Sequence, residues 1–143
     1  MMQDEINHRA RAMWDEDRAS QGIGMHLDEV APGRARLSMQ VTTPMTNGHG
    51  ICHGGFIFSL ADSAMAFAVN PRGEPAVAQH AAITFIRPAQ VGETLIAEAA
   101  ERMHAGRSGM YDVRVTTEGG ELVAEFRGHT RTLRRKEAAN GGA

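Results

Sequence analysis

One stretch of the chain, residues 54–70, restricts the fold more than any other. It reads GGFIFSLADSAMAFAVN, and Asp62 is its only charged residue. A helix that is apolar almost all round is normally enclosed by the rest of its domain. Ionised carboxylates are rarely buried unless they are paired or have a chemical task. The stretch therefore predicts a buried central helix and marks Asp62 as the first candidate functional residue.

The polar and small residues of this helix fall on one side. Positions three and four apart share a helix face, so one stripe holds Gly55, Ser59, Asp62, Ser63 and Ala66. The stripe is narrow and polar. A substrate or a second chain could lie against it.

The residues that open the helix are His53, Gly54 and Gly55. Two glycines leave the first backbone N–H groups uncovered by side chains, and a helix N-terminus carries partial positive charge. Such donors can form an oxyanion site. The alternative is structural: the glycine pair lets the helix pack closely on a sheet, and Asp62 is a solvated or capped carboxylate.

Composition narrows the class of protein. The chain has 143 residues, 42% of them hydrophobic, which predicts one globular domain with a substantial core. A net charge of −2 does not favour a nucleic-acid partner. Cys52 is the only cysteine, so no intrachain disulfide forms, and the polar, acidic start of the chain does not resemble a signal peptide. No apolar run reaches the ~20 residues of a membrane span, so we expect a cytoplasmic protein without a membrane partner.

Periodicity elsewhere predicts a short helix and then strands. Residues 4–21 place apolar side chains, Trp14 among them as a core residue, at helical spacing before Gly22. Strict alternation and a Pro32-Gly33 turn predict a hairpin of residues 25–30 and 35–41. Further strands are predicted at residues 76–86, 94–103, 110–117 and 122–132, the last two joined by a tight glycine turn.

This order of elements predicts an α+β fold in which a curved antiparallel sheet wraps one long central helix. We divide the chain into an N-terminal helix packing on the domain (1–24), the domain itself (25–133) and a disordered tail (134–143).

Short motifs add a family resemblance. The segments NGHGICHGG, LAD, TFIRPA and YDV occur in the order and setting found in one group of enzymes. Over about residues 12–131 the chain resembles hotdog-fold acyl-CoA thioesterases of the phenylacetic acid degradation (PaaI) type. The most specific matches are Asn47-Gly48, His53-Gly54-Gly55 and Asp62.

The resemblance implies roles for individual residues. The aspartate matching Asp62 acts as nucleophile or general base, and the backbone N–H matching Gly54 polarises the thioester carbonyl. The residues matching Asn47 and His53 shape the pocket and help to hold the attacking water or the carbonyl. Ser63 fits a hydroxyl residue that often follows the aspartate. Gln79 is the nearest match to a polar residue from the strand after the helix.

The resemblance also implies dimers assembled into a homotetramer, and geometry leads to a dimer independently. Gly54 and Asp62 would both need to lie within ~3–3.5 Å of one carbonyl group. Eight residues of helix separate them by roughly 12 Å. A two-fold homodimer with cross-chain active sites resolves this conflict. The partner's helix N-terminus would favour ionised Asp62 while burial disfavours it, and the sequence leaves the balance open.

The predicted substrate is the CoA thioester of a small acid, with an aromatic, phenylacetyl-type group (with or without a hydroxyl) expected. Gly55, Ser63 and Gln79 are candidate substrate contacts. Arg87 and Arg107 are candidate cations for the CoA phosphates, although each could be an ordinary solvated charge. Neither a metal nor an organic cofactor is expected.

Four alternative functions fit the residues less well. His49, Cys52 and His53 make a poor metal site without a second cluster. Cys52 beside His53 is a poor nucleophile pair, because neighbours on an extended loop point to opposite sides. An enoyl-CoA hydratase-like protein would typically have a histidine about one helical turn beyond Asp62, and this chain has none there. A non-catalytic acyl-CoA-binding sensor would place a carboxylate against a thioester without gaining affinity.

Overall fold

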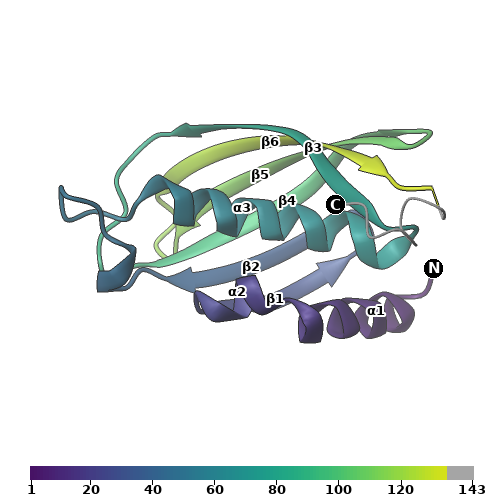
Figure 1. Cartoon of the computed structure of the whole chain (residues 1–143), viewed down its shortest axis with the longest axis horizontal. Coiled ribbons are helices and arrows are strands. Elements are labelled where there is room, and N and C mark those ends of the chain that lie inside the picture. Colours follow the sequence, from purple (N-terminus) through teal and green to yellow (C-terminus); the bar gives the residue numbers. More distant parts are fainter. Residues whose placement is uncertain (135–143) are drawn as a thin grey trace.

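An antiparallel sheet curves around one long helix in the computed structural model, which describes residues 1–134 (Figure 1). Within these residues the sheet has six strands, in the order β1-β2-β4-β5-β6-β3. Their bounds are β1 Met25–Ala31, β2 Arg34–Gln40, β3 Ala76–Phe85, β4 Thr94–Ala105, β5 Ser108–Thr117 and β6 Leu122–Thr132. The predicted tail lies outside the described residues, apart from Arg134.

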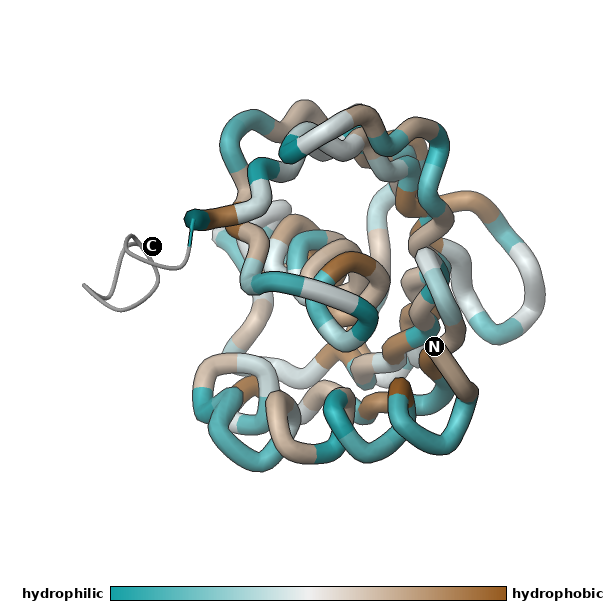
Figure 2. The backbone as a smooth tube through the Cα atoms, turned by 90° about the vertical axis from the view of Figure 1, so that its right-hand side faces the viewer, coloured by the Kyte–Doolittle hydropathy of each residue, from teal (hydrophilic) through white to brown (hydrophobic). Residues whose placement is uncertain are grey.

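The central helix, α3, spans Gly54–Val69 and is followed by the 3-10 turn η2, Asn70–Arg72. Its view end-on in Figure 2 shows the sheet curving around it, with the N-terminal helices beneath. Leu60, Ala64 and Phe67 are fully buried, as the apolar composition of the helix requires. The predicted α+β architecture is therefore confirmed.

The register of the sheet follows from alternation along each strand. Leu37, Ala97, Val115 and Ala124 stand opposite one another on four neighbouring strands and are fully buried beneath α3. On the outer face, the row one position away alternates in charge: Glu29, Arg36, Glu98, Arg114 and Glu125. A one-residue slip would bury this charged row, so the register is strongly specified.

The N-terminal segment differs from the expected single helix over 4–21. It forms α1, Gln3–Glu16, and α2, Arg18–Gly22, interrupted at Asp17. The Asp17 side chain accepts the Ser20 N–H at 2.9 Å and so caps α2, which explains the interruption. Trp14 packs on Phe67 of α3 with ring centroids 5.8 Å apart, in agreement with its predicted place in the core.

Close packing of α3 on the sheet depends on Gly128 of β6. A Cβ atom at this position would overlap the sulfur of Met65, which is 1% exposed. Met65 therefore fills the space that a side chain on β6 would need.

We expect Gly128→Ala to destabilise the protein by about 1–3 kcal/mol, because the added methyl overpacks a filled core. Urea unfolding measures the change. Gly119→Ala is the matched control, since its Cβ would meet only Thr117 Oγ1, at 3.8 Å. Equal stability of the two variants would show that Met65 moves aside without cost.

Candidate active site

The start of α3 is capped by His53. Its Nδ1 accepts the Gly55 N–H at 2.9 Å, and its carbonyl accepts the Phe56 N–H at 3.0 Å. An accepting Nδ1 carries no proton, so the neutral ring is protonated at Nε2. The expectation that both glycines present unbound N–H groups is therefore wrong for Gly55, whose donor is taken by the cap.

The Gly54 N–H, in contrast, finds no acceptor within residues 1–134. Its φ angle is not in the left-handed region, so backbone conformation does not demand glycine here. The reason is close approach: a Cβ on Gly54 would lie 2.8 Å from Cζ of Phe85. No local pattern predicts this contact, because Phe85 is 31 residues away along the chain.

The loop before α3 is braced by its own hydrogen bonds. Asn47 Oδ1 accepts the N–H of His49 at 2.9 Å and that of Ile51 at 3.4 Å. The His53 N–H donates to Met45 O at 2.7 Å. The side-chain NH₂ of Asn47 has no acceptor in the described part of the chain, so it can donate to a ligand.

Asn47 and Gly54 line one cavity of about 370 Å³, together with Phe85, Ile86 and Arg87. Phe85 and Ile86 are 51% and 49% exposed, so the mouth of this cavity is apolar. The cavity brings together three of the predicted site residues: Asn47, Gly54 and Arg87.

Arg87 reaches this cavity already paired. It donates to Glu93 at 3.0 Å and to Glu121 at 3.1 Å. Hydrogen bonds to Glu93 and then Glu121 raise the pKa of Arg87, and the Arg87 bond lowers the pKa of Glu93. Two carboxylates therefore already bind this guanidinium.

Arg107 and Gln79 lie apart from this cavity. Arg107, in the β4–β5 turn, donates to Thr132 O at 2.9 Å, whereas Phe85 pairs with Ala124 eight residues back along β6. Arg107 is thus ~27 Å away along the strand. Gln79 is exposed on edge strand β3, at a break in register with β6.

Asp62 lies two turns into α3 and is partly exposed. Burial raises its pKa above the usual carboxyl value. Its carboxylate forms no hydrogen bond or ion pair with any residue from 1 to 134. Because α3 is continuous from Gly54, the two groups are held roughly 12 Å apart.

Ser63 contacts the N-terminal helices, and the surroundings of Cys52 bear on its alternative role as a nucleophile. Ser63 Oγ lies 2.8 Å from Ser20 Oγ of α2, a contact that the sequence did not predict. Cys52 is buried, which raises the pKa of its thiol, and His53 Nδ1 is occupied by Gly55. The arrangement does not support thiolate catalysis.

Two observations concern metal and membrane. Residues 1–134 contain no group of three or more His, Cys, Asp or Glu side chains placed to hold a metal ion. No helix in this described range is long and apolar enough to cross a membrane.

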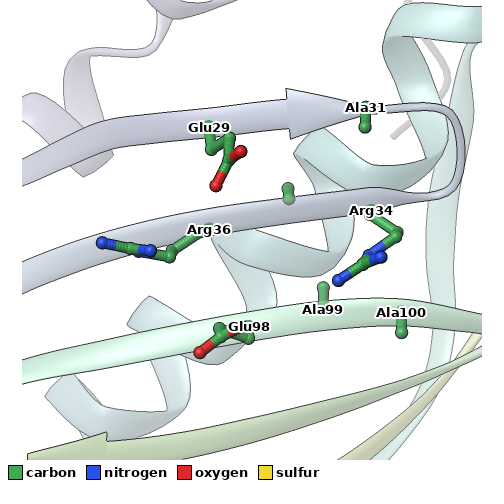
Figure 3. A pocket seen from close by; sticks show the side chains of 8 residues that line it. Glu29, Ala31, Arg34, Arg36, Glu98, Ala99 and Ala100 are labelled. Atoms are coloured by element: carbon green, nitrogen blue, oxygen red, sulfur yellow. The ribbon is translucent and has the colours of Figure 1, made fainter.

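A separate hollow of about 240 Å³ lies on the outer face of β1, β2 and β4 (Figure 3). Arg34 and Arg36 lie there with Glu29 and Glu98. Neighbouring Leu37 is fully buried on the opposite face of the sheet. The hollow contains none of the predicted site residues and belongs to the charged outer row.

A curved antiparallel sheet around one buried helix is the hotdog fold, as the resemblance implied. The thioesterase superfamily model matches residues 49–124, more than half of the chain. Acyl-coenzyme A thioesterase PaaI of Escherichia coli K12 is 40% identical over 124 residues, which cover 87% of this chain and 89% of that protein. The chain therefore belongs to the thioesterase superfamily, and the predicted family of thioester-hydrolysing enzymes is confirmed.

Further similarities agree with this family. The solved structure of E. coli PaaI, from the phenylacetic acid degradation operon, superposes with a TM-score of 0.91 at 36% identity, covering 94% of this chain and 97% of that one. Human acyl-coenzyme A thioesterase 13 is 34% identical over 110 residues, which cover 75% of this chain and 78% of that protein.

The raised pKa of Asp62 generates a stability prediction. A folded pKa above the unfolded value means that ionised Asp62 weakens the fold at neutral pH, and that this cost disappears as the carboxyl protonates. We expect Asp62→Asn to raise the free energy of unfolding at pH 7, with the gain shrinking as the pH falls through the raised pKa of folded Asp62 and disappearing below about pH 4, where the carboxyl is protonated in both states. Urea unfolding at both pH values tests this. A less stable variant at pH 7, or a gain independent of pH, would contradict the sign.

Proposed function

We propose that the protein hydrolyses acyl-CoA thioesters, with Asp62 as general base or nucleophile and the Gly54 N–H as the oxyanion donor. One observation carries the proposal: among residues 1–134, the N–H at the start of α3 has no acceptor and the Asp62 carboxylate, two turns later, has no partner. A thioester needs both groups, one for its oxygen and one for its carbon.

We further propose that each active site combines two chains. The ~12 Å between the two groups on one rigid helix exceeds the reach of a single carbonyl. Strand β3 supports a partner at this edge: its ten residues, AVAQHAAITF, include no acidic residue, lysine, arginine or proline, and much of the strand is exposed. Such an edge readily pairs with another strand. Two chains related by a two-fold axis give two equivalent sites, and we propose that these dimers assemble into a homotetramer.

The chemistry of hydrolysis can be followed at named atoms. In the general-base route, Asp62 takes a proton from water as the water oxygen bonds to the carbonyl carbon. The Gly54 N–H stabilises the negative oxygen. Collapse then breaks the carbon–sulfur bond, and the proton held by Asp62 passes to the CoA sulfur, which releases free acid and CoA and restores the carboxylate. In the nucleophile route, Asp62 attacks the carbonyl carbon directly, the carbon–sulfur bond breaks to release CoA, and water then opens the resulting anhydride. After one turnover in H₂¹⁸O, ¹⁸O found in Asp62 identifies the nucleophile route, because only attack of water on the side-chain carbonyl of that anhydride places it there.

Other residues shape the site in this proposal. Asn47 donates its unbound NH₂ to the substrate or water, and His53 fixes the helix start by capping it. We assign Gln79, at the break in β3, to substrate contact, and Arg87 and Arg107 to the CoA phosphates. Because Arg87 and Arg107 lie far apart in one chain, they would serve different sites or approach one site from two chains.

We propose a small aromatic acyl group of the phenylacetyl type, with or without a hydroxyl. The similarity to PaaI from a phenylacetic acid degradation operon supports it, and the apolar mouth formed by Phe85 and Ile86 is compatible with it. A panel of acyl-CoA substrates ranked by kcat/KM tests this choice. Neither a metal nor an organic cofactor is required by the proposed reaction, and a cytoplasmic location stays a prediction.

The first functional prediction concerns the carboxylate. Asp62→Asn keeps the shape of the side chain but removes the base or nucleophile, so we expect thiol release to fall by ~10²–10⁴. Free CoA is measured with a thiol reagent, with and without a chelator. Near-normal release by a folded variant would refute the role of Asp62. Substrate binding without thiol release by the unmodified protein would favour the acyl-CoA sensor instead.

The second functional prediction concerns the cross-chain site. Gly54→Pro removes the N–H at a position whose backbone is compatible with proline, because it is the first helical residue and His53 before it is extended at ψ 135°, although the added Cβ meets the Phe85 ring. Gly54→Pro and Asp62→Asn homodimers should each be nearly inactive. Co-refolding them should restore activity, since a mixed dimer rebuilds one intact site and places both lesions in the other.

Gly54→Ala is the matched control, because its Cβ meets the Phe85 ring as proline's does while its N–H remains. Activity lost equally in both variants would be assigned to the Phe85 contact. Mixed dimers that form but stay as inactive as their parents would contradict the shared site.

A further inference from the structure

A short chain of hydrogen bonds links the N-terminal helices to the residue after Asp62. Ser20 of α2 is 2% exposed. Its Oγ lies 2.7 Å from Asp17 Oδ2 and 2.8 Å from Ser63 Oγ, while Asp17 Oδ1 accepts the Ser20 N–H. The two ends of this chain are therefore a carboxylate outside the sheet domain and a hydroxyl on the proposed catalytic helix.

The number of protons available fixes the donor and the acceptor of each hydrogen bond in this series. A carboxylate only accepts hydrogen bonds, so the Ser20 hydroxyl donates to Asp17. Ser20 then has no proton left for Ser63, so the Ser63 hydroxyl donates to Ser20 Oγ. The hydroxyl proton of Ser63 is used in this hydrogen bond. The Ser63 oxygen can therefore interact with a further group only as an acceptor.

We propose that Asp17, acting through Ser20, holds Ser63 as a hydrogen-bond acceptor beside Asp62, where it receives the second O–H of the attacking water. Asp62 takes the first O–H, so two acceptors orient one water molecule. The inference rests on the proposed function and favours its general-base route. Asp17 and Ser20 are positioning residues, and the N-terminal helices become part of the active site.

The electrostatic surroundings of Asp62 agree with this arrangement. Burial is the one cause that raises its pKa, and no donor from residues 1–134 reaches its carboxylate. The sheet faces α3 with apolar side chains such as Leu37 and Val115. Ionisable groups on the segments around α3 include His53, Cys52, Asp17, Arg18 and the buried Tyr111, and none of them forms a hydrogen bond or ion pair with the Asp62 carboxylate among residues 1–134. A hydroxyl proton from Ser63 would lower the pKa of Asp62 and weaken it as a base.

Asp17→Asn tests the direction of these hydrogen bonds with little structural change. Asparagine is as good an N-cap as aspartate, and its Oδ1 can still accept the Ser20 N–H. Its NH₂, however, donates to Ser20 Oγ, so Ser20 donates to Ser63 and the Ser63 proton becomes free. We expect kcat to fall by about tenfold, the rate equivalent of one ordinary hydrogen bond, with little change in KM. We also expect the acid limb of the kcat–pH profile to move to lower pH.

Three further variants complete the test. Ser20→Ala also frees the Ser63 proton and should shift the acid limb in the same direction. Ser63→Ala removes acceptor and donor together and should lower kcat without moving the limb downward. Gln21→Ala removes a bond from α2 to Trp14 O that does not reach Ser63, and it should leave both readouts unchanged.

A wild-type profile for Asp17→Asn would overturn the inference, and so would a loss of activity with the acid limb in place. The result is separable from the proposed function. An active Asp62→Asn variant would refute that function, whereas an inactive Asp62→Asn variant beside an unaltered Asp17→Asn variant would refute this inference alone.

Discussion

The burial of an apolar helix inside a curved sheet is the constraint on which the rest of the structure depends. The inner faces of the strands are apolar or small because α3 rests on them, and Gly128 is needed where Met65 approaches β6. The same burial removes part of the water around Asp62, and no residue from 1 to 134 pairs with its carboxylate, so its pKa is raised. A carboxylate kept in such a place destabilises the fold when ionised, and this cost is the physical reason to look for a chemical role.

The start of the same helix supplies the complementary group. His53 caps Gly55, Phe85 covers Gly54, and the Gly54 N–H has no acceptor in the described part of the chain. A rigid helix fixes the spacing of this donor from Asp62, and this spacing is the reason why the proposed reaction needs two chains. The exposed, uncharged edge of β3 offers a surface for that assembly.

The sequence predicted the elements whose patterns are local. The apolar run of residues 54–70, the alternating strands and the glycine turns carry their own periodicity, so helix, strands and fold class followed from them. The capping of Gly55 by His53, the Phe85 ring over Gly54 and the bond from Ser20 to Ser63 depend on side-chain geometry or on contacts between distant segments. The distance between Arg87 and Arg107 likewise emerges only once the strands are paired. Asp17 did carry a local signal, since a capping aspartate three residues before Ser20 can start a new helix.

The most direct test of the shared site is a crystal structure with a non-hydrolysable acyl-CoA analogue. We expect the analogue's carbonyl oxygen to lie within about 3–3.5 Å of the Gly54 nitrogen of one chain. We expect the carbonyl carbon to lie at a similar distance from the Asp62 carboxylate of the other chain, or from a water held by it. A carbonyl contacted by both groups of the same chain, or bound away from Gly54 altogether, would refute the shared site.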